Sequence, residues 1–436
     1  MPKAAFTTLG CKVNQYETQS ILESFERGGF DIVPIGETAD VYVINTCSVT
    51  GQAESKSHQT VRSLARRNPN AKIVVTGCAA QMALNERKSF EAAHLLVPNP
   101  EKLSTFERFV QAFPEFSSVE RKAETEFSRF FGRSRATIKI QDGCSVMCSY
   151  CSIPFTRPVM TSRNFEHVVN EARRYARLGH QEIILAGVLI GSYGPETGSG
   201  GPDFEQLIEK LCELPEVKRI RISSIEMRQV SNRLIAMMSE KGSKIAPHLH
   251  IPLQSGSTKV LKDMHRPYAQ DDFVRLCETV YDRIHDVAIT TDIMVGFPTE
   301  TDEDFEQTVR VCERIRFAKG HIFRFSLRPG TPAHKWGDAV SAKTKQERSA
   351  RLIEITNQTR DEFSRRFVGR KLTAAVEGKR SRDGLLTAIT GNYIHVEFPG
   401  PEYLAGKVVP IRIVSAQSGC AAGDLAADRL PLRMIE

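Results

Sequence analysis

The stretch GCSVMCSYC, residues 143–151, places three cysteines within eight positions, at Cys144, Cys148 and Cys151. It follows a short apolar segment, residues 137–140, whose β-branched side chains predict a buried strand. Three thiolates on one loop suit three irons of a 4Fe–4S cluster and leave the fourth iron for another ligand. A zinc site is the alternative, because Cys148 and Cys151 have the spacing of half such a site, but no second cysteine pair lies nearby.

From this loop toward the C-terminus, short apolar strand patterns alternate with helical patterns. Beginning with the strand before the cysteines, the predicted strands are residues 137–140, 182–186, 219–223, 248–252, 288–292 and 321–325. Helical periodicity lies between them at residues 168–178, 204–212, 233–241, 271–285 and 303–316. Six strand–helix repeats predict a barrel-like parallel sheet that stops short of the eight units of a complete β/α barrel.

Toward the N-terminus the same alternation occurs in a separate series. The predicted strands are residues 3–8, 41–45 and 72–76, and the predicted helices are residues 15–27, 53–67 and around 81–92. Strand–helix repeats of this kind predict a parallel sheet with right-handed crossovers. The charged segment 123–135 that follows has no clean period, and we interpret it as a linker.

The C-terminal part has a different pattern. After a basic helix at residues 343–366, short alternating segments at 372–377, 385–389, 393–398 and 408–414 are separated by Gly, Pro or Asp-Gly. They predict a small all-β module, and OB-like barrels of this size often bind RNA or single-stranded nucleic acid. The predicted fold class is α/β in three domains: a parallel-sheet domain (1–122), a partial (β/α)6 barrel (136–366) and a small all-β barrel (368–436).

Composition bounds the class of protein. The 436 residues carry 59 Lys+Arg against 52 Asp+Glu, so the net charge of +7 is a mild bias toward polyanionic partners. Eight of these basic residues lie within 343–370, where they form either a solvated helix face or a nucleic-acid contact. No stretch approaches the ~20 apolar residues of a membrane helix. Without a signal pattern at its N-terminus, the chain is expected to be cytoplasmic, with its ten cysteines reduced.

A second set of cysteines follows the predicted N-terminal strands. Cys11, Cys47 and Cys78 each lie two or three residues past the end of one strand. Because the carboxyl ends of parallel strands meet at one edge of a sheet, these three residues are expected to converge. Buried core cysteines are the alternative, but they do not explain three equivalent positions. We therefore predict a second three-cysteine iron–sulfur site and treat the remaining thiols as ordinary ones: Cys212, Cys277, Cys312 and Cys420.

In these motifs the chain resembles the radical S-adenosylmethionine (SAM) methylthiotransferases. The resemblance rests on the run of residues 143–154 and on three N-terminal runs, LGCKVNQYET (9–18), NTCSVT (45–50) and TGCAAQ (76–81). It covers nearly the whole chain and implies that the C-terminal module is a TRAM domain, an RNA-binding barrel. The sequence around Cys11 is similar to that of the MtaB branch of the family, which acts on N6-threonylcarbamoyladenosine at position 37 of tRNA.

The resemblance also implies SAM-binding residues at the strand ends of the barrel. Gly187 matches a backbone position near the SAM amino group, and the polar residues Glu226 and Gln254 match positions near the ribose and methionine. Arg266 fits a partner for the SAM carboxylate, and Asp292, expected to end the fifth strand, could hold ribose hydroxyls. The alternative is that Glu226 and Asp292 merely cap helices and that Arg266 is a surface residue.

The function implied is methylthiolation of carbon 2 of N6-threonylcarbamoyladenosine, with two 4Fe–4S clusters and two SAM molecules as cofactors. The expected partners are the anticodon arm of tRNA and a reducing electron donor, with no membrane. One alternative is the same chemistry on another tRNA adenosine or on a ribosomal-protein aspartate. A non-enzyme alternative is a two-cluster electron carrier or an iron-sensing RNA binder, which has no need of a six-unit barrel with polar strand ends.

Overall fold

The computed structural model describes residues 1–117, 134–195 and 201–426. They fall into two compact units. The first takes its residues from Met1–Phe131, Asp142–Met160 and Ser326–Pro332, and the second from Gly132–Gln141, Thr161–Phe325 and Ala333–Glu436. Most of the predicted linker lies outside the described residues, as do residues 196–200. Within the described ranges, no helix is both long and apolar enough to cross a membrane.

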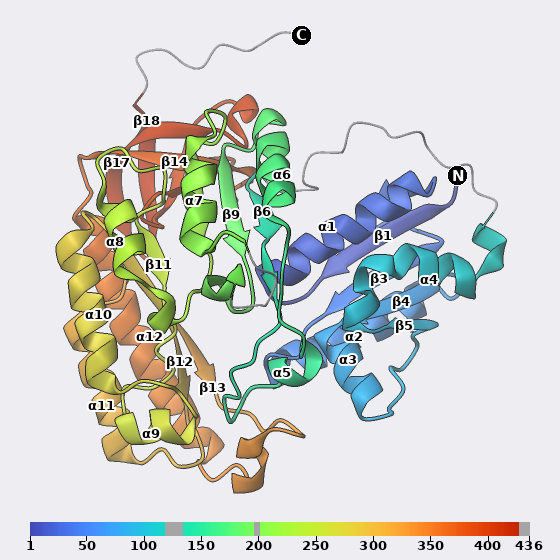
Figure 1. The fold of residues 1–436 in the computed structure, drawn as a ribbon, viewed down its shortest axis with the longest axis horizontal. Helices are drawn as coiled ribbons and strands as arrows, with labels where there is room; N and C mark the ends of the chain where they lie inside the picture. Colours follow the sequence, from blue (N-terminus) through green and yellow to red (C-terminus); the bar gives the residue numbers. More distant parts are fainter. Residues whose placement is uncertain (118–133, 196–200, 427–436) are drawn as a thin grey trace. The chain divides into compact units, whose positions relative to one another are not determined.

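The first unit contains a five-stranded parallel sheet in the order β2-β1-β3-β4-β5 (Figure 1). Its strands are β1 (Lys3–Thr8), β2 (Asp31–Val33), β3 (Val41–Thr46), β4 (Lys72–Gly77) and β5 (Leu95–Val97). Its helices are α1 (Lys12–Arg27), α2 (Gly51–Arg67), α3 (Cys78–Asn85), α4 (Thr105–Ala112), α5 (Ile153–Thr156), η1 (Asn99–Ser104) and η2 (Pro114–Phe116). The strand order reverses between β1 and β3, and such switch points are where open α/β sheets bind ligands.

Helices cover both faces of this sheet. One apolar cluster joins Val43 and Val74 to Phe25 of α1 and Phe109 of α4. The other joins strand residues such as Tyr42 to α2 and α3. This two-sided burial explains why the strands read as continuous apolar runs in the sequence.

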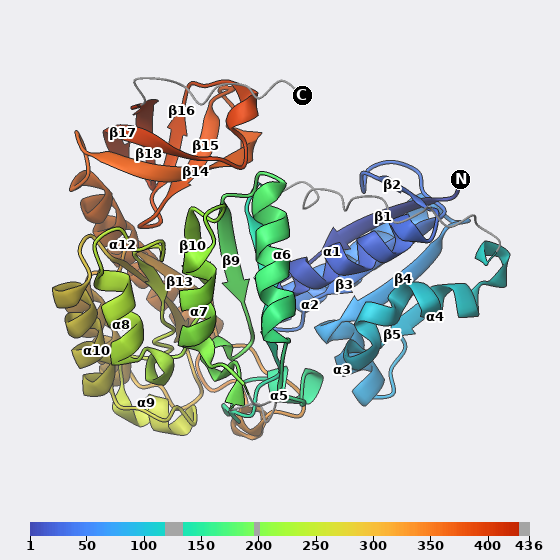
Figure 2. The same cartoon turned by 45° about the horizontal axis from the view of Figure 1, so that its top comes forward.

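The second unit begins with six parallel strands that follow chain order. They are β6 (Ala136–Lys139), β9 (Glu182–Ala186), β10 (Arg219–Ile222), β11 (His248–His250), β12 (Ala288–Val295) and β13 (Lys319–Arg324). Figure 2 labels three of them, β9, β10 and β13. The six strands form two three-stranded sheets, which parallel bridges Ile220–Ile245 and Ser224–His250 connect between β10 and β11. The predicted partial six-strand barrel is therefore confirmed. The two-residue strands β7 (Gln141–Asp142) and β8 (Thr161–Ser162) precede and follow the cysteine loop in the sequence.

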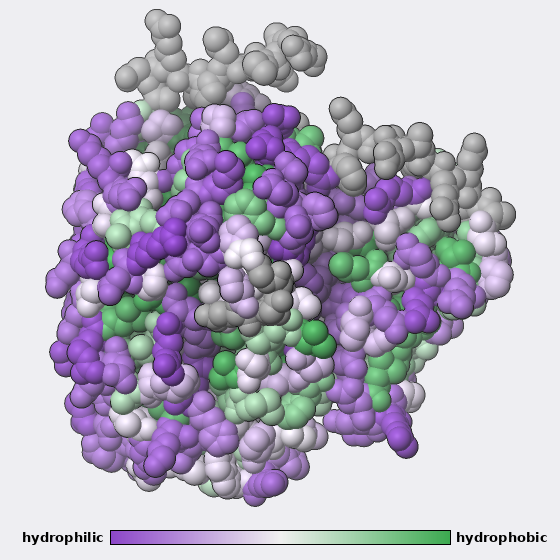
Figure 3. Space-filling model, viewed as in Figure 1, coloured by the Kyte–Doolittle hydropathy of each residue, from purple (hydrophilic) through white to green (hydrophobic). Residues whose placement is uncertain are grey.

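Helices follow the barrel strands as the sequence pattern predicts. They are α6 (Phe165–Arg177), α7 (Phe204–Glu213), α8 (Asn232–Ser239), α9 (Thr258–Asp263), α10 (Gln270–Arg283), α11 (Asp302–Ile315) and α12 (Ala342–Arg365), with short η3 (Ile190–Ser192), η5 (Met227–Gln229) and η6 (Pro332–Trp336). Capping boxes start α7 at Asp203 and α11 at Thr301, where a side-chain oxygen accepts a backbone N–H of the first turn. The face shown in Figure 3 is mostly hydrophilic over α8 and α10.

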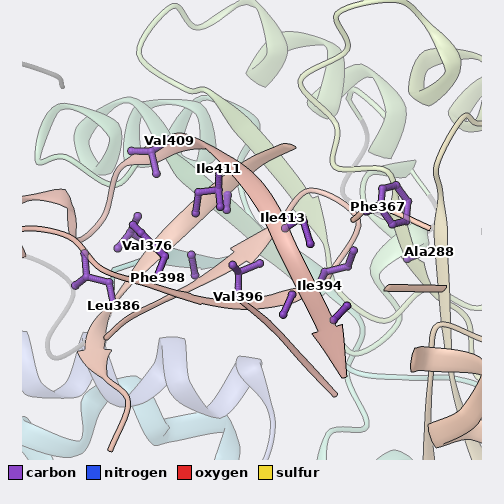
Figure 4. Close-up of a cluster of buried hydrophobic side chains, with 14 of the residues drawn as sticks. Ala288, Phe367, Val376, Leu386, Ile394, Val396, Phe398, Val409, Ile411 and Ile413 are labelled. Carbon is purple, nitrogen blue, oxygen red and sulfur yellow. The ribbon is translucent and has the colours of Figure 1, made fainter. Parts of the chain in front are cut away.

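The C-terminal part of the second unit is a closed barrel in the order β14-β15-β16-β18-β17. Its elements are β14 (Lys371–Arg380), β15 (Leu386–Thr390), β16 (His395–Phe398), η7 (Glu402–Leu404), β17 (Val408–Gln417) and β18 (Cys420–Leu425). Its core is continuous with that of the partial six-strand barrel, because Phe363 of α12, Phe367 just after that helix, Ala288 and Ala318 belong to the same buried cluster (Figure 4). The predicted all-β module is therefore confirmed.

A buried ion-pair network joins the two barrels of the second unit. Glu182 of β9 is fully buried and accepts from Arg221 at 2.8 Å and Arg219 at 3.0 Å, with Arg135 at 3.5 Å. Arg219 also donates to the Thr373 carbonyl at 2.9 Å. Arg221 donates to the carbonyls of Thr390, the last residue of β15, at 2.9 Å and of the following Gly391 at 3.1 Å. The Glu182 carboxylate thus orients Arg219 and Arg221, whose remaining N–H groups donate to backbone carbonyls of the β-barrel.

Candidate active site

Three cysteines meet at the carboxyl edge of the five-stranded sheet. Cys11 is the N-cap residue of α1, Cys47 follows β3, and Cys78 begins α3 directly after β4. Cys47 and Cys78 are buried, whereas Cys11 is exposed. The sheet topology thus brings together residues that lie 67 positions apart in the sequence, as the strand pattern predicts.

Two glycines hold the loops of this edge close together. Gly10 has φ +96°, and a Cβ atom on it would lie 2.7 Å from the Cβ and Sγ atoms of Cys47. Gly77 has φ +100°, and a Cβ there would lie 2.3 Å from the Thr46 carbonyl oxygen. Only glycine combines this backbone conformation with such close approach.

The second cysteine set lies on one loop of the same unit. Cys148 is buried, and Cys144 and Cys151 are half-buried. Backbone N–H groups point at two of the sulfurs, from Val146 to Cys144 Sγ at 3.4 Å and from Ile153 to Cys151 Sγ at 3.4 Å. Such hydrogen bonds favour the thiolate form that binds iron.

The donor chemistry of both sets fits iron–sulfur clusters, although the protein-only structure does not arrange them as ligands. All ten cysteines are free thiols. Among the described residues, no three His, Cys, Asp or Glu side chains already form a metal-ion site. Burial raises the pKa of Cys47 to about 11. Burial also acts to raise the pKa of Cys78, but Arg157 and then Lys102 outweigh it, so that this thiol titrates below its ordinary value.

A buried charge network lies beside these thiols. The guanidinium of Arg157 donates to both carboxylate oxygens of Glu17, at 2.9 and 2.8 Å. Lys102 donates to the same carboxylate at 2.7 Å. All three residues are at most 5% exposed, so their charges are compensated by one another and not by water.

Arg157 also bridges the cysteine loops. Its guanidinium donates to Asn14 Oδ1 at 3.0 Å and to Asp142 Oδ1 at 2.6 Å. Asn14 in turn donates to the carbonyls of Leu9 and Thr46, both at 2.9 Å, one in the loop of Cys11 and one in the loop of Cys47. The residue therefore connects the 143–151 loop with two loops of the sheet edge.

The predicted SAM residues all belong to the second unit. Gly187 follows β9, and the next two backbone N–H groups donate to Gln141 Oε1 at 3.0 and 2.7 Å. A Cβ on Gly187 would lie 3.2 Å from that same oxygen. The fully buried Gln141 thus fixes the loop whose backbone was predicted to meet SAM.

Glu226 and Arg266 form an ion pair. Arg266 is 7% exposed, which contradicts the surface alternative, and its Nε donates to the Tyr268 hydroxyl at 3.1 Å. Tyr268 donates to the Pro252 carbonyl at 3.0 Å, next to the Gln254 loop. Glu226 is the N-cap residue of η5, but its side chain makes no capping bond there. The geometry therefore supports neither structural alternative.

Gln254 and Asp292 lie on paired backbone. Gln254 has φ +64°, and its N–H donates to the Asp292 carbonyl at 2.9 Å. Asp292 was expected to end its strand, which is wrong, because β12 continues to Val295 and remains paired with β13 up to that residue. The Asp292 carboxylate lies 3.3 Å from His250 Nε2, a neighbour that the sequence analysis did not single out.

The basic helix is less available to a polyanion than its sequence indicates. Lys345 and Arg348 are buried, and Arg348 donates to Glu300 at 2.6 Å and to Asp302 at 2.7 Å. The guanidinium of Arg348 is thus committed to two carboxylates of the same unit. Lys343 remains largely exposed.

Sequence reasoning missed Glu17, Lys102, Arg157, Gln141 and His250. One signal was present: Glu17 lies three residues after Asn14, which places two polar side chains on the buried face of α1. Lys102 and Arg157 carry no such signal, since their partner is distant in sequence.

Family models match all three parts of the chain. Residues 3–97 match the model described as "Uncharacterized protein family UPF0004", residues 138–312 match the radical SAM superfamily, and residues 365–426 match the TRAM domain. Among solved structures, the radical S-adenosylmethionine methyltransferase TsrM from Kitasatospora setae has a TM-score of 0.53. That match is 14% identical and covers 76% of this chain and 75% of that one, so it supports the fold alone.

Curated relatives are similar along nearly the whole length. Threonylcarbamoyladenosine tRNA methylthiotransferase MtaB of Bacillus subtilis is 36% identical, covering 95% of this chain and 94% of the relative. MtaB of Thermotoga maritima is 34% identical over 99% and 100% of the two chains. The tRNA-2-methylthio-N(6)-dimethylallyladenosine synthase of Methylacidiphilum infernorum is 33% identical over 95% and 92%. The chain therefore belongs to the radical SAM methylthiotransferase family.

Proposed function

We propose that this enzyme methylthiolates carbon 2 of N6-threonylcarbamoyladenosine at position 37 of tRNA, converting t6A to ms2t6A. The observation that carries the proposal is the pair of cysteine triplets within one compact unit. Two relatives at 34–36% identity bear the name of that activity. An electron carrier would need neither the partial barrel nor a TRAM domain.

Six cysteines would hold two 4Fe–4S clusters. Cys144, Cys148 and Cys151 would hold the radical cluster, and Cys11, Cys47 and Cys78 the auxiliary cluster. When bound with SAM, these groups supply one-electron cleavage of a sulfonium carbon–sulfur bond and a source of sulfur. The buried positions of Cys47, Cys78 and Cys148 keep half of the six-cysteine donor set away from water.

The barrel residues would bind and orient SAM. Arg266 is a cationic fork held in place by Glu226 and Tyr268, and a planar fork suits the SAM carboxylate. Gln254 and Asp292 offer polar side chains that are not fully buried. Gln141 fixes the backbone after Gly187, so that these donors are pre-organised before the cofactor arrives.

The TRAM barrel would supply phosphate contacts that orient the anticodon arm. These contacts are electrostatic, so they should weaken as the salt concentration rises. Of the basic helix, exposed side chains such as Lys343 could contribute, whereas Lys345 and Arg348 are committed to buried acids.

Two variants that each lack one cysteine, Cys148→Ala and Cys47→Ala, test the proposal. The protein is reconstituted anaerobically with iron and sulfide and incubated with SAM, a reductant and t6A-containing tRNA. Wild type should hold about eight irons, and Cys148→Ala and Cys47→Ala about four each. Cys148→Ala should abolish formation of 5′-deoxyadenosine. Cys47→Ala should retain it but yield no methylthiolated nucleoside by mass spectrometry. Methylthiolated product from Cys47→Ala would contradict the role of the auxiliary site.

A second candidate substrate is N6-dimethylallyladenosine, because one relative at 33% identity is named for it. The same assay with tRNA carrying that nucleoside distinguishes the two. We expect product only from t6A-containing tRNA, and preferential modification of the dimethylallyl nucleoside would reverse the assignment. A parallel reaction with a ribosomal protein tests the aspartate alternative.

A further inference from the structure

We propose that the TRAM barrel takes part in SAM binding, because its residue Tyr393 fixes one end of a chain of side chains whose other end positions the Asp292 carboxylate. The chain consists of His248, Thr290 and His250, and all five residues belong to the second unit. The inference rests on the proposed function, since it concerns the site that the barrel residues would form for SAM. It adds positioning residues to that site, one of them from a different module.

The first step is that strand pairing gathers the four barrel residues on one face. Thr290 and Asp292 are two residues apart on β12, so their side chains share a face of the strand. β11 pairs with β12 in parallel register, with His250 opposite Thr290. His248 lies two residues before His250 and therefore shares the same face.

The second step is that these side chains contact one another in series. Asp292 Oδ1 lies 3.3 Å from His250 Nε2. The other ring nitrogen of His250, Nδ1, lies 2.9 Å from Thr290 Oγ1, and the same oxygen lies 3.0 Å from His248 Nε2. Thr290 and His248 are 1% and 4% exposed, whereas the side chain of Asp292 is 28% exposed. The carboxylate thus stands at the end of the chain that a ligand can reach.

The third step is that these contacts set the direction of each hydrogen bond. A carboxylate only accepts, so the proton of a neutral His250 ring belongs on Nε2, which leaves Nδ1 as an acceptor. Thr290 then donates its hydroxyl proton to that Nδ1, and its oxygen accepts from His248 Nε2. Each member fixes the orientation of the next, so the chain holds the His250 ring in place beside Asp292.

The fourth step is that the chain ends on the TRAM barrel. The His248 ring stacks on the ring of Tyr393, with centroids 4.2 Å apart and planes at 9°. Tyr393 lies between β15 and β16 and has φ +66°, a conformation that costs free energy in any residue other than glycine. The guanidinium of Arg221 lies 5.3 Å from the centre of the same ring. The strained turn therefore places an aromatic ring where it fixes His248.

Equilibrium dialysis of SAM against the full chain, reconstituted with iron and sulfide, tests the inference. The measurement is made at pH 8 without reductant or tRNA, so that SAM is bound but not cleaved. Asp292→Asn should weaken SAM binding about tenfold, because it removes a charged acceptor. Thr290→Val removes a hydroxyl at nearly constant volume and should weaken binding about threefold, whereas Thr290→Ser should restore it. Because Thr290 is buried, its hydroxyl acts on SAM through His250 and not by contact.

A second arm tests the contribution of the TRAM barrel. Tyr393→Leu removes the stacked ring and should weaken SAM binding about threefold, whereas Tyr393→Phe keeps the ring and should bind SAM as wild type does. If both residues act through one chain, their effects are not additive. The double variant Thr290→Val/Tyr393→Leu should therefore bind SAM no more weakly than the weaker of the two single variants.

Two matched controls remove the same groups elsewhere in the second unit. Thr359→Val removes a buried hydroxyl that donates to the Phe317 carbonyl at 2.8 Å. Tyr403→Leu removes another ring that packs against the core of the TRAM barrel. Both controls should bind SAM with wild-type affinity. Losses in the controls equal to those of Thr290→Val and Tyr393→Leu would mean that general destabilisation weakens SAM binding, and would overturn the inference.

The remaining outcomes separate this inference from the proposed function. Wild-type affinity in Thr290→Val and Tyr393→Leu, with Asp292→Asn weakened, would overturn the role of the chain alone. Wild-type affinity in Asp292→Asn would also overturn the inference, because the carboxylate would then make no contact with SAM. A wild-type protein that takes up iron but binds no SAM would instead overturn the proposed function.

Discussion

We expect assembly of the proposed auxiliary site to depend on a single backbone position, Gly10. A methyl group there would overlap the side chain of Cys47, and φ +96° disfavours any L-residue. We expect Gly10→Ala to displace the Cys47 loop and to remove about four irons per chain while leaving the radical cluster loaded. Iron and sulfide analysis of the reconstituted variant checks this.

Gly179 gives the matched control for that prediction. It has nearly the same backbone conformation, φ +97°, but a Cβ there meets nothing within 4 Å. Gly179→Ala should therefore carry only the backbone cost of about 1–2 kcal/mol and retain full iron content. Equal iron loss in both variants would mean that backbone strain, and not contact with Cys47, disturbs the site.

The candidate site could be predicted from the sequence where chemistry and spacing coincide. The cysteines at 144, 148 and 151 are close in sequence, and those at 11, 47 and 78 share a position relative to predicted strands. The ion pairs around them could not be predicted in this way. Glu17 is joined to Arg157 across 140 residues, and only the folded chain shows that both side chains are buried.

At the scale of elements, the stability of the β9–β10 pair depends on one buried carboxylate, that of Glu182. Glu182→Gln would leave Arg219 and Arg221 as buried cations without a counter-ion, although their bonds to the β-barrel carbonyls would remain. Breaking a buried pair in this way costs about 3–5 kcal/mol. Urea unfolding should show a loss of that size in the free energy of unfolding. A loss below about 1 kcal/mol would mean that water or other groups compensate the arginines.

The pH dependence of stability should report the same carboxylate. Burial acts to raise the pKa of Glu182, but the three arginines outweigh it and hold the pKa at about 2, below the ordinary 4.5. Its stabilisation is therefore complete above pH 4.5 and is lost as the pH falls toward 2. In Glu182→Gln this part of the acid-induced loss of stability should be absent.

The exposed Glu209, paired with Arg233, is the control, and Glu209→Gln should change the free energy of unfolding by less than about 1 kcal/mol.

Element prediction succeeded for long periodic segments and failed for short ones. The strand pattern at residues 3–8 matches β1 residue for residue. The three-residue strands β2 and β5 escaped notice because they are too short to show a period. The helix expected around residues 81–92 is wrong in its extent, since α3 runs from Cys78 and ends at Asn85, just before Arg87 adopts positive φ.

At the scale of the whole molecule, tRNA affinity should depend on salt through the β-barrel surface. Lys379 and Arg382 are exposed on or next to β14, and we expect Lys379→Gln/Arg382→Gln to weaken tRNA binding. Each lost phosphate contact should reduce the slope of log affinity against log salt by about 1. Filter binding across a salt series measures both quantities.

The control changes the same charge on the helices of the half-barrel. Lys210→Gln/Lys241→Gln removes two exposed cations from α7 and the turn after α8. It should leave the salt slope close to that of wild type. An equal decrease in both variants would indicate that net charge, and not the TRAM barrel, governs binding.

Truncating the chain near residue 370 would be a poor substitute for these point variants. Deletion of the β-barrel would expose Phe363 and Phe367, which share its core, and would remove the carbonyls that Arg219 and Arg221 contact. Loss of tRNA binding after such a deletion would not be separable from unfolding of the half-barrel.

The core and the arginine–carbonyl contacts that the two barrels share also limit how this enzyme can be re-engineered. A foreign RNA-binding module grafted after α12 would have to present main-chain oxygens where Thr373, Thr390 and Gly391 now do, and an aromatic-sized cavity for Phe367. Modules lacking those features would leave N–H groups of Arg219 and Arg221 without their present carbonyl acceptors, although both arginines would keep Glu182. Retargeting to other RNAs is therefore better pursued by resurfacing the native barrel than by exchanging it.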